Sequence, residues 1–300
     1  MRVLNFGSLN IDYVYPVDHI IAPGETEPTG EINENCGGKG LNQSIALAKA
    51  GVEVFHAGLV GEEGQILIDK CKENNVDSTY IRKISGRSGH TIIQVDKNGQ
   101  NSILLFGGAN RRLTKDFIDE VLGNFEKGDI LVLQNEVNLL DYIIDKAYER
   151  QMVIVLNPSP FDGALSKCDL SKISLFLLNE IEGGQISGQS DHEKILVDLK
   201  KKFPEAKVVL TLGSEGSVYQ FKDEVYRQGI YKVKAVDTTA AGDTFTGYFI
   251  SSIINGMDVP DGLALAAKAA AISVTRPGAT DSIPLKAEVL STELEEATKA

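Results

Sequence analysis

The sequence has only three cysteines, Cys36, Cys71 and Cys168, and they lie far apart along the chain. Their spacing contains no C-x-x-C motif, and so few cysteines cannot form the disulfide framework of a small secreted domain. The four histidines share no metal-ligand spacing, and no serine or cysteine stands in a recognisable nucleophile elbow. A reducing environment suits this cysteine usage, so we expect a cytoplasmic protein.

Basic residues are outnumbered by acidic ones. The chain has 30 lysines and arginines against 42 aspartates and glutamates, which gives a formal net charge of -12 at pH 7. Nucleic-acid binding depends on clustered lysines and arginines that neutralise phosphates, and the sequence contains no such cluster. We therefore expect no nucleic-acid partner, and an anionic substrate would need a local source of positive charge.

Long apolar runs are also missing. The first ten residues, MRVLNFGSLN, contain one basic residue and no apolar core of signal-peptide length, and no later run approaches the length that crosses a bilayer. We expect no membrane association. The sequence has no internal repeat, low-complexity tract or charge block, and its 300 residues suffice for one large α/β domain or two smaller ones.

Short apolar runs alternate with helical patterns through most of the chain. Four runs have strand character, DILVLQN, MVIVLN, ISLFLLN and AKVVLTLG, and helical patterns at 139–150 and 191–202 lie among them. Such alternation implies β-α-β crossovers. The sequence therefore predicts an α/β fold with a doubly wound, mainly parallel sheet flanked by helices.

Several of the predicted strands end in a polar residue or a glycine. These residues are Asn135 with Glu136, Asn157, Asn179 and Gly213. In open parallel sheets, ligands bind beyond the carboxyl ends of the strands, so the four positions predict a binding crevice. The alternative is ordinary loop chemistry, because asparagine and glycine favour turns.

Two segments interrupt the alternation. Residues 12–35 are rich in Pro, Gly, Glu and Asn, and residues 90–106 have the pattern of a β-hairpin with its turn at Asn98-Gly99. We expect these segments to form a small β lid, with residues 1–11, 36–89 and 107–300 forming the core domain. Such a lid can close over a site or pair with the lid of a second subunit.

A glycine-rich passage, CGGKGLNQSIALAKAG, spans residues 36–51 and precedes a predicted helix. Glycines at a helix start let the backbone approach a ligand closely, and the free N–H groups of the first turn favour an anion or a hydroxyl-rich partner. The passage is not a Walker A loop, because Lys39 is followed by Gly40 rather than by Ser or Thr. A tight strand-to-helix turn with a solvated lysine is the other interpretation.

The passage DTTAAGDTFTGYF at 237–249 places Asp243 at the start of another predicted helix, in the position of an N-cap. The pattern predicts a helix that is buried on one side, with Phe245, Tyr248, Phe249, Ser252 and Ile253 on the buried face. A capped helix accounts for the passage. A phosphoryl-transfer site also accounts for it, because the amides of residues 240–243 would cradle the phosphoryl group while Asp243 takes a proton from the attacking hydroxyl.

The passages GGKGLNQ and DTTAAGDTF, about two hundred residues apart, resemble the two signatures of the ribokinase-like (PfkB) carbohydrate kinases. Five further motifs stand in the family's order: GSLNID, GGAN followed by LT, LLNEIE, TLGSEG and VTRPGATDSIP. The resemblance covers nearly the whole chain, and within the family the two signatures look most similar to those of the ribokinases. It implies an ATP-dependent sugar kinase that phosphorylates the 5-hydroxyl of D-ribose.

The resemblance also implies roles for individual residues. Asp243 matches the catalytic base, and the backbone of Ala240, Ala241 and Gly242 matches the anion hole. The positions that match sugar-holding residues of the ribokinases are Asn10, Asp12, Gly38, Lys39, Asn42 and Glu136. Carboxylates and amides suit this task, because they form hydrogen bonds with paired hydroxyls in a closed pocket.

Further matches concern the nucleotide and the ions. Asn179 and Glu182 match a motif associated with Mg²⁺ and phosphate, often acting through water, and the matches to the nucleotide loop are Thr211, Gly213, Ser214 and Gly216. The resemblance implies a K⁺ site beside the anion hole, formed by Asp237, Thr239, Ser273, Arg276, Gly278 and Ser282. The other interpretation of RPGATDS is a helix C-terminus, with Arg276 facing the last carbonyls and Gly278 ending the helix.

The chain departs from the family pattern in two places. Where a polar side chain near adenine is expected, it has Ala267 and Lys268, and the segment EINENCGG is unusually polar. The choice of nucleotide is therefore open. The alternative acceptors are 2-deoxyribose, fructose or another hexose, or a nucleoside. A non-catalytic sugar or nucleotide sensor is the alternative of another class, whereas a Rossmann dehydrogenase lacks support because GSLN stands where G-x-G-x-x-G is required. Like the ribokinases, the chain is expected to form a homodimer through the lid.

Overall fold

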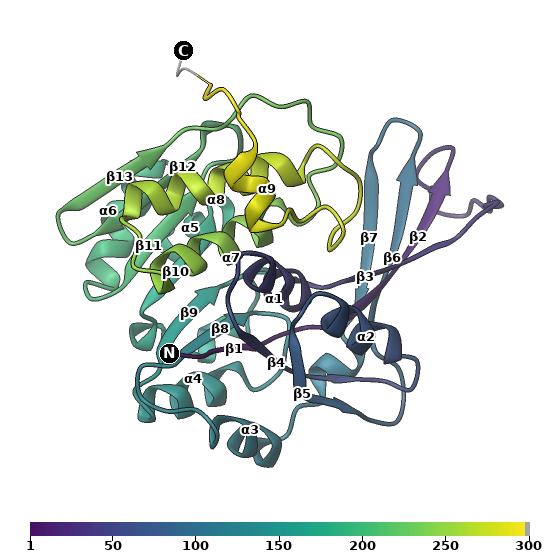
Figure 1. Cartoon of the computed structure of the whole chain (residues 1–300). Helices are drawn as coiled ribbons and strands as arrows, with labels where there is room; N and C mark the ends of the chain where they lie inside the picture. Colours follow the sequence, from purple (N-terminus) through teal and green to yellow (C-terminus); the bar gives the residue numbers. More distant parts are fainter. Residues whose placement is uncertain (298–300) are drawn as a thin grey trace.

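The computed structural model describes residues 1–297, which form two β-sheets (Figure 1). Within these residues the main sheet has nine strands in the order β13-β12-β11-β10-β9-β8-β1-β4-β5. The strands are β1 (Val3–Phe6), β4 (Val54–Val60), β5 (Asp77–Lys83), β8 (Ile130–Gln134), β9 (Val153–Asn157), β10 (Leu175–Asn179), β11 (Lys207–Thr211), β12 (Ser217–Phe221) and β13 (Glu224–Gln228). All neighbours pair in parallel except β11 with β12 and β12 with β13.

Helices cover both faces of the main sheet. One apolar layer joins the sheet to α1 (Lys39–Lys49), α2 (Gln65–Glu73), α7 (Ala241–Ile254), α8 (Val259–Ser273) and α9 (Lys286–Ser291). The other layer joins it to α3 (Lys115–Leu122), α4 (Leu140–Glu149), α5 (Glu180–Ser187) and α6 (His192–Lys202). The predicted α/β fold with a doubly wound, mainly parallel sheet is confirmed, and β12 with β13 adds an antiparallel hairpin at one edge.

The small sheet stands apart from the main body and has the strand order β3-β2-β6-β7 (Figure 1). Its strands are β2 (Asn10–Val17), β3 (Asn33–Gly37), β6 (Gly89–Asp96) and β7 (Asn101–Phe106). The predicted hairpin is present, because β6 pairs antiparallel with β7 around a turn in which Gly99 has φ 79°. We call these four strands the lid sheet.

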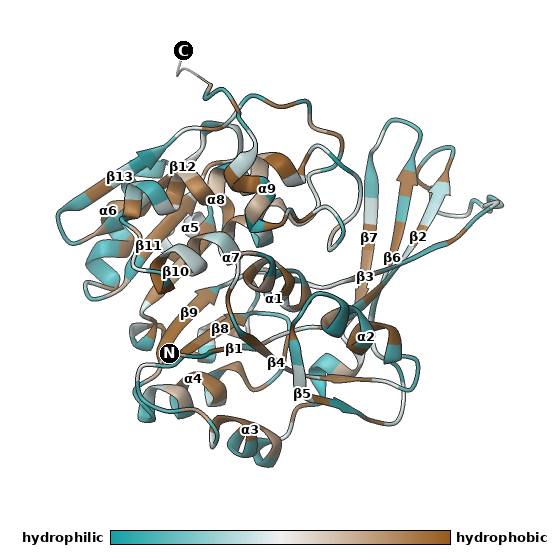
Figure 2. Cartoon of the chain, viewed as in Figure 1, coloured by the Kyte–Doolittle hydropathy of each residue, from teal (hydrophilic) through white to brown (hydrophobic). Residues whose placement is uncertain are grey.

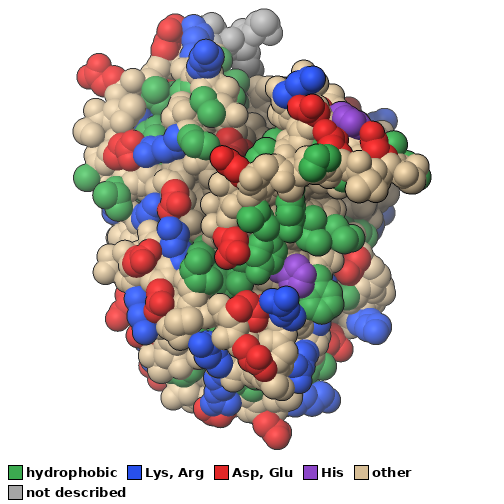
Figure 3. All heavy atoms as spheres, turned by 90° about the vertical axis from the view of Figure 1, so that its right-hand side faces the viewer, with side chains coloured by type: hydrophobic (Ala, Val, Ile, Leu, Met, Phe, Trp, Pro, Cys, Tyr) green, Lys and Arg blue, Asp and Glu red, His purple; other side chains and the backbone are tan. Residues whose placement is uncertain are grey.

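Helices α1 and α2 contact strand β3 of the lid sheet, whereas strand β7 is open to solvent. Strand β7 is exposed along its whole length, including the apolar residues Ile103, Leu104, Leu105 and Phe106. Apolar and polar residues mix along the strands of the lid sheet, whereas the central strands of the main sheet are mostly apolar (Figure 2). Viewed from the side of the lid sheet, apolar side chains gather in a surface patch (Figure 3).

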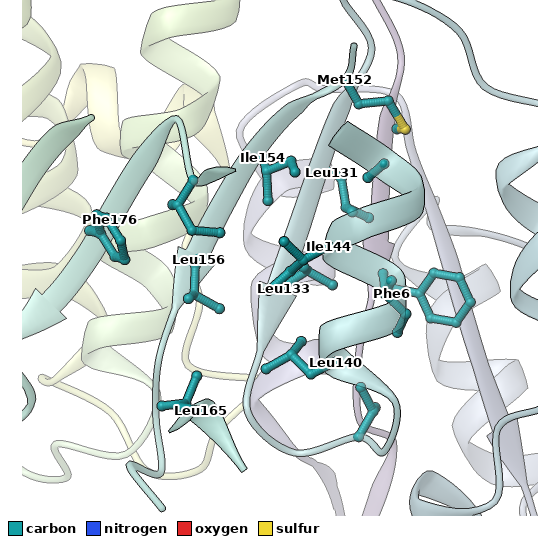
Figure 4. Packing of buried hydrophobic residues seen from close by; sticks show 14 of the residues in the cluster. Phe6, Leu131, Leu133, Leu140, Ile144, Met152, Ile154, Leu156, Leu165 and Phe176 are labelled. Atoms are coloured by element: carbon teal, nitrogen blue, oxygen red, sulfur yellow. The ribbon is translucent and has the colours of Figure 1, made fainter. Parts of the chain in front are cut away.

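The core follows from the apolar strand patterns. Strand β8 is buried at every position because helices pack against both of its faces. On one face, Leu140 and Ile144 of α4 lie over Leu131 and Leu133 (Figure 4). The ring of Phe6 meets the Phe117 ring edge-on with centroids 5.9 Å apart. Two continuous apolar layers thus enclose β1 and β8, and this packing fixes the starting points of the loops that follow the two strands.

Helix α7 differs from its prediction. Every residue from Asp243 to Ser252 is buried, so the helix is enclosed on all sides rather than buried on one face. It lies between α1 and α8, and Gly247 permits close contact with α1, because a Cβ at that position would lie 2.4 Å from the Cβ of Ala46. Among residues 1–297, no helix combines the length and the apolar character that crossing a membrane requires.

Candidate active site

The site is centred on the first turn of α7. The residue before the helix, Ala240, has the left-handed conformation φ 60°, ψ 10°, and the helix begins at Ala241. Asp243 is therefore the third residue of the helix, and the prediction that it is the N-cap is wrong. The reason is that the alanine, without a capping side chain, turns the chain into the helix and leaves the carboxylate of Asp243 free for other partners.

Those partners come from α1, about two hundred residues earlier in the chain. Asn42 Nδ2 donates to Asp243 Oδ2 and Gln43 Nε2 donates to Asp243 Oδ1, each over 2.9 Å. Asp243 is only 7% exposed. The amide oxygen Oδ1 of Asn42 is buried and has no hydrogen-bond partner among residues 1–297. The sequence interpretation included Asn42 but missed Gln43.

A cavity of about 210 Å³ lies against Asp243. It brings together residues from both signature passages and from the ends of three strands, namely Lys39, Asn157, Ser159, Leu177, Leu178, Asn179, Glu182, Thr211, Thr238, Ala240, Ala241, Gly242, Asp243 and Thr246. The predicted crevice at the carboxyl ends of the strands is thus present, and Asn157 and Asn179 face it. The first turn of α7 borders the same cavity, so its amides lie where an anion would bind.

A second cavity of about 470 Å³ adjoins the first through Thr211, Thr238, Ala241 and Gly242. All four residues expected in the nucleotide loop line it: Thr211, Gly213, Ser214 and Gly216. Its remaining wall is largely apolar and includes Phe245, Ala267, Ala270, Ala271 and Val274. Ala267 thus contributes an apolar surface where a polar contact was expected, and this surface suits a flat aromatic ring.

Glu136 and Lys39 meet near Asp243. The backbone N–H of Lys39 donates to Glu136 Oε2 over 3.1 Å, and Ser8 Oγ also donates to that carboxylate. Burial raises the pKa of Glu136, and the charge of Lys39 opposes this rise. Burial by itself lowers the pKa of Lys39, but the negative charges of Asp243 and Glu136 outweigh it and the net pKa is raised. Lys39 therefore provides the local positive charge that the acidic composition made necessary.

Asn10 and Asp12 lie on β2, where the lid sheet joins the core. Asn110 Nδ2 donates to Asn10 Oδ1 over 2.7 Å, and Thr91 Oγ1 donates to Asp12 Oδ1 over 2.5 Å. Burial raises the pKa of Asp12 to about 6, with a further contribution from the charge of Glu136. The sequence analysis quoted GGAN without giving Asn110 a role and missed Thr91, because their partners are remote in sequence.

The space beside these residues is limited by two glycines. A Cβ on Gly37 would lie 1.9 Å from Asp12 Oδ2, and Gly38, with φ 96°, turns the chain from β3 into α1. A larger side chain at either position would displace Asp12 or the start of α1. The glycines expected from the first signature are thus required by close approach and by a positive φ, respectively.

Asn179 and Glu182 form a capping box at the start of α5. Glu182 N donates to Asn179 Oδ1 over 2.9 Å, and Asn179 N donates back to Glu182 Oε2 over 3.1 Å. Both side chains line the cavity beside Asp243. The capping box fixes the Glu182 carboxylate at the cavity wall, where it keeps lone pairs for water or a hydrated cation.

Of the six residues expected at a K⁺ site, three are joined by hydrogen bonds, namely Asp237, Thr239 and Gly278. Asp237 Oδ1 accepts from Thr239 N and Oγ1, and Gly278 N donates to Asp237 Oδ2 over 3.0 Å. The side chains of three others bond elsewhere: Ser273 to the Ala270 carbonyl, Ser282 to the Ala279 carbonyl and Arg276 to Glu288. Residues 1–297 contain no grouping of three or more His, Cys, Asp or Glu side chains suited to a metal ion.

The alternative interpretation of this loop as a helix end is wrong. Helix α8 ends at Ser273 with Val274 as its C-cap, so Gly278 lies beyond the helix, although its φ is 89°. Arg276 points to Glu288 on α9 rather than to the last carbonyls of α8. The glycine is needed for a turn inside the loop that Asp237 holds in place.

Comparison with known proteins is consistent with this geometry. A family model described as pfkB family carbohydrate kinase matches residues 2–286. A ribokinase of Staphylococcus aureus is 33% identical over 299 residues, covering 96% of this chain and 98% of the relative. A deoxyribokinase of Salmonella typhi is 31% identical over 302 residues, covering 95% and 96%.

Solved structures resemble the whole fold. The crystal structure of a ribokinase from Thermotoga maritima has a TM-score of 0.87 with 33% identity and covers 97% of this chain and 98% of its own. The structure of an Arabidopsis thaliana ribokinase complexed with ribose and ATP has a TM-score of 0.85 with 27% identity, covering 96% and 97%. The likeness therefore extends over both the main sheet and the lid sheet.

Proposed function

The chain belongs to the pfkB family of carbohydrate kinases, and we propose that it transfers the γ-phosphate of ATP to the 5-hydroxyl of D-ribose. The observation that carries the proposal is the buried carboxylate of Asp243, which borders both the cavity at the strand ends and the residues of the first signature. The ribokinase names of the full-length relatives, and the ribose and ATP of the Arabidopsis structure, support the choice of substrates.

In this proposal Asp243 is the general base. It accepts the proton of the 5-hydroxyl as the oxygen attacks the γ-phosphorus, while the bond from that phosphorus to the ADP oxygen breaks. The amides of the first turn of α7 and the ammonium group of Lys39 face the negative charge that develops on the phosphoryl oxygens. The adenine lies against the apolar wall that contains Ala267, and the phosphates extend past residues 213–216 toward Gly242.

The sugar lies between the core and the lid sheet. Asn10, Asp12 and Glu136 offer acceptors and donors for its hydroxyls, and Asn42, which is bonded to Asp243, completes the proposed set. Gly38 leaves space for the ring, and Lys39 binds a ring hydroxyl or the transferred phosphate. Thr91 and Asn110 hold the two β2 side chains in place.

Mg²⁺ would be held with the ATP phosphates near Asn179 and Glu182. The residues fit such a cation, because the capping box presents a carboxylate to a polar cavity that has room for waters. When bound, Mg²⁺ would neutralise phosphate charge. We also propose K⁺ at the loop between α8 and α9, supported by the Asp237 carboxylate, which joins Thr239 to Gly278 beside the anion hole.

We further propose that two copies associate through their lid sheets and that the enzyme acts in the cytoplasm. Strand β7 is an unpaired edge with four exposed apolar residues, which is costly in an isolated protein. All three cysteines within the described residues are free, as a reducing compartment requires.

A second candidate substrate is 2-deoxyribose, favoured by the similarity to a deoxyribokinase at nearly the same identity as to the ribokinases. The two sugars differ by the 2-hydroxyl alone. If Asp12 or Asn10 binds that hydroxyl, ribose gains a charge-assisted hydrogen bond that 2-deoxyribose cannot make.

The test is ADP release by the purified protein with ATP and Mg²⁺ and one of ribose, 2-deoxyribose, fructose, arabinose, adenosine or no sugar, each with and without K⁺. We expect the largest kcat/KM with ribose and a further rise with K⁺. The Asp243→Asn variant should keep its fold and lose roughly a hundredfold to ten-thousandfold in kcat. Release with another sugar would overturn the assignment of ribose, and sugar binding without any ADP release would support a sensor.

A further inference from the structure

Three buried amide side chains lead from Asp243 into the core, and we call them the amide chain. Gln43 of α1, Gln134 at the end of β8 and Asn5 of β1 are each at most 1% exposed. Gln43 Nε2 donates to Asp243 Oδ1 over 2.9 Å. Gln134 Nε2 in turn donates to Gln43 Oε1 over 2.6 Å and to Asn5 Oδ1 over 3.1 Å.

Every N–H of the amide chain has an acceptor. The second N–H of Gln43 donates to Asn157 Oδ1 over 3.2 Å. Asn5 Nδ2 donates to the Gly40 carbonyl and to Ser44 Oγ, each over 2.8 Å. Reversing the Gln43 amide would place its oxygen against the carboxylate and against another amide oxygen. The network therefore fixes one orientation, in which Gln43 presents an N–H to Asp243.

Stability does not explain the amide chain. On the same face of the sheet, Asn5 lies beside the apolar Val3 and Val132 and also beside the buried His56, its register partner on β4. Apolar residues of similar shape would be at least as stable there, and Gln134 Oε1 is buried without a partner. The backbone also leaves room for this side chain, because a Cβ on Gly7 would lie 2.6 Å from Gln134 Oε1.

We propose that Gln43, held by Gln134, is a positioning residue that fixes the rotation of the Asp243 carboxylate. Gln43 occupies Oδ1, while Asn42, which has a free amide oxygen, lies on the side of Oδ2. Asn42 Nδ2 donates to Oδ2, so each carboxylate oxygen is held by one amide of α1. Without Gln43 only the bond from Asn42 still restrains the carboxylate, which then turns more freely about its Cβ–Cγ bond, so fewer bound substrates meet a correctly placed base. The inference rests on the proposed kinase function.

The first test uses methionine, which has nearly the shape of glutamine and no amide. Gln43→Met should lower kcat by about tenfold to a hundredfold and change the KM for the sugar by less than about threefold, because ground-state binding does not need the base. Gln134→Met should lower kcat less. The double variant should be no slower than Gln43→Met, because both changes remove the same restraint.

Two further variants separate positioning from packing. Gln43→Glu places a second carboxyl beside Asp243 and should move the acidic limb of the kcat–pH profile to higher pH, since like charges oppose ionisation. Ser251→Ala is the control. Ser251 is a buried polar residue of α7, the helix of Asp243, and its hydroxyl donates to the Ala50 carbonyl, away from the amide chain. It should cost stability and leave kcat unchanged.

A measurement without substrate keeps the inference separate from the proposed function. The carboxyl carbon of Asp243, identified by NMR through its loss in Asp243→Asn, should shift in Gln43→Met and in Gln134→Met but not in Ser251→Ala. A wild-type kcat in Gln43→Met, or an unchanged carbon signal in it, would overturn the positioning role. If no sugar is phosphorylated and the signal shifts as expected, the proposed substrate fails while the restraint on Asp243 stands.

Discussion

We expect Asp12 to make sugar binding sensitive to pH. Burial raises its pKa to about 6, and only the ionised carboxylate accepts hydrogen bonds from two sugar hydroxyls. Acidification protonates this carboxylate and so removes the acceptor. The KM for ribose should therefore rise as the pH falls through 6, by about tenfold at pH 5. The measurement is KM between pH 5 and 8. In Asp12→Asn the KM should be higher and independent of pH, and a wild-type KM that stays constant would contradict the role.

His56 makes the fold sensitive to acid. It is fully buried, bonded to Ser44 Oγ and to the Gly7 carbonyl, and burial lowers its pKa to about 4. Below pH 6.5 His56 binds a proton in the unfolded chain but stays neutral in the folded chain. The free energy of unfolding therefore decreases as the pH falls toward 4, by about 3 kcal/mol in all.

Urea unfolding between pH 7 and 4 checks this expectation. The advantage of the wild type over His56→Gln should shrink on acidification, because glutamine bonds to the same partners without a proton to gain. His90→Gln, in the lid sheet, is the matched control. Parallel pH curves for wild type and His56→Gln would contradict the assignment.

For single residues, the sequence indicated which side chains could form the site but not which residues they contact. Asp243, Lys39 and Asn42 could be singled out because they stand in recognisable signatures. Gln43 and Asn110 stand in the same motifs, yet their roles depend on contacts with residues about a hundred to two hundred positions away. No local pattern encodes such contacts, because burial and close approach are set by the packing of whole elements.

Among the elements, the contact between α1 and α7 sets the distance from Asp243 to Asn42 and Gln43. Adding a methyl group in Gly247→Ala would place a Cβ 2.4 Å from the Ala46 Cβ and 2.8 Å from the Leu47 N. The helices must separate, which should cost about 1–3 kcal/mol of stability. The separation should also lower kcat, because Asp243 is one turn from the contact. Thermal unfolding and kcat are the measurements.

The control for this change is Gly163→Ala, since a Cβ there has no atom within 4 Å. It should leave both quantities nearly unchanged. A Gly247→Ala protein with normal stability would show that the two helices adjust without strain. The helix pattern at 243–253 was predictable from sequence, but its complete enclosure was not, because periodicity does not reveal a third neighbour such as α8.

For the whole molecule, the lid sheet predicts the oligomeric state. Leu104 is 67% and Phe106 is 51% exposed on the unpaired edge strand β7. Wild type should sediment as a dimer, and Leu104→Lys should shift it toward the monomer and raise the KM for the sugar. Leu290→Lys, at a similarly exposed leucine of α9, should remain a dimer. A monomeric wild type would refute the pairing of lids.

The fold class was predictable because alternating strands and helices permit few architectures. The order of the strands was not, since β1 lies between β4 and β8, and only long-range packing decides this insertion. The antiparallel β12–β13 edge was missed for a related reason: its two short strands follow the last predicted parallel strand without a helical pattern to set them apart.

The hydrogen bonds from Asn42 and Gln43 to Asp243 span 201 and 200 positions, respectively, and this separation affects folding during translation. A ribosome makes α1 about two hundred residues before α7, so a nascent chain that ends between them has both amides but lacks the carboxylate that accepts their hydrogen bonds. The two helices can meet only after the roughly two hundred residues that separate them have been made. The appearance of catalytic activity during synthesis would therefore report the completion of the fold, and truncated chains that end before α7 should be both inactive and prone to aggregation.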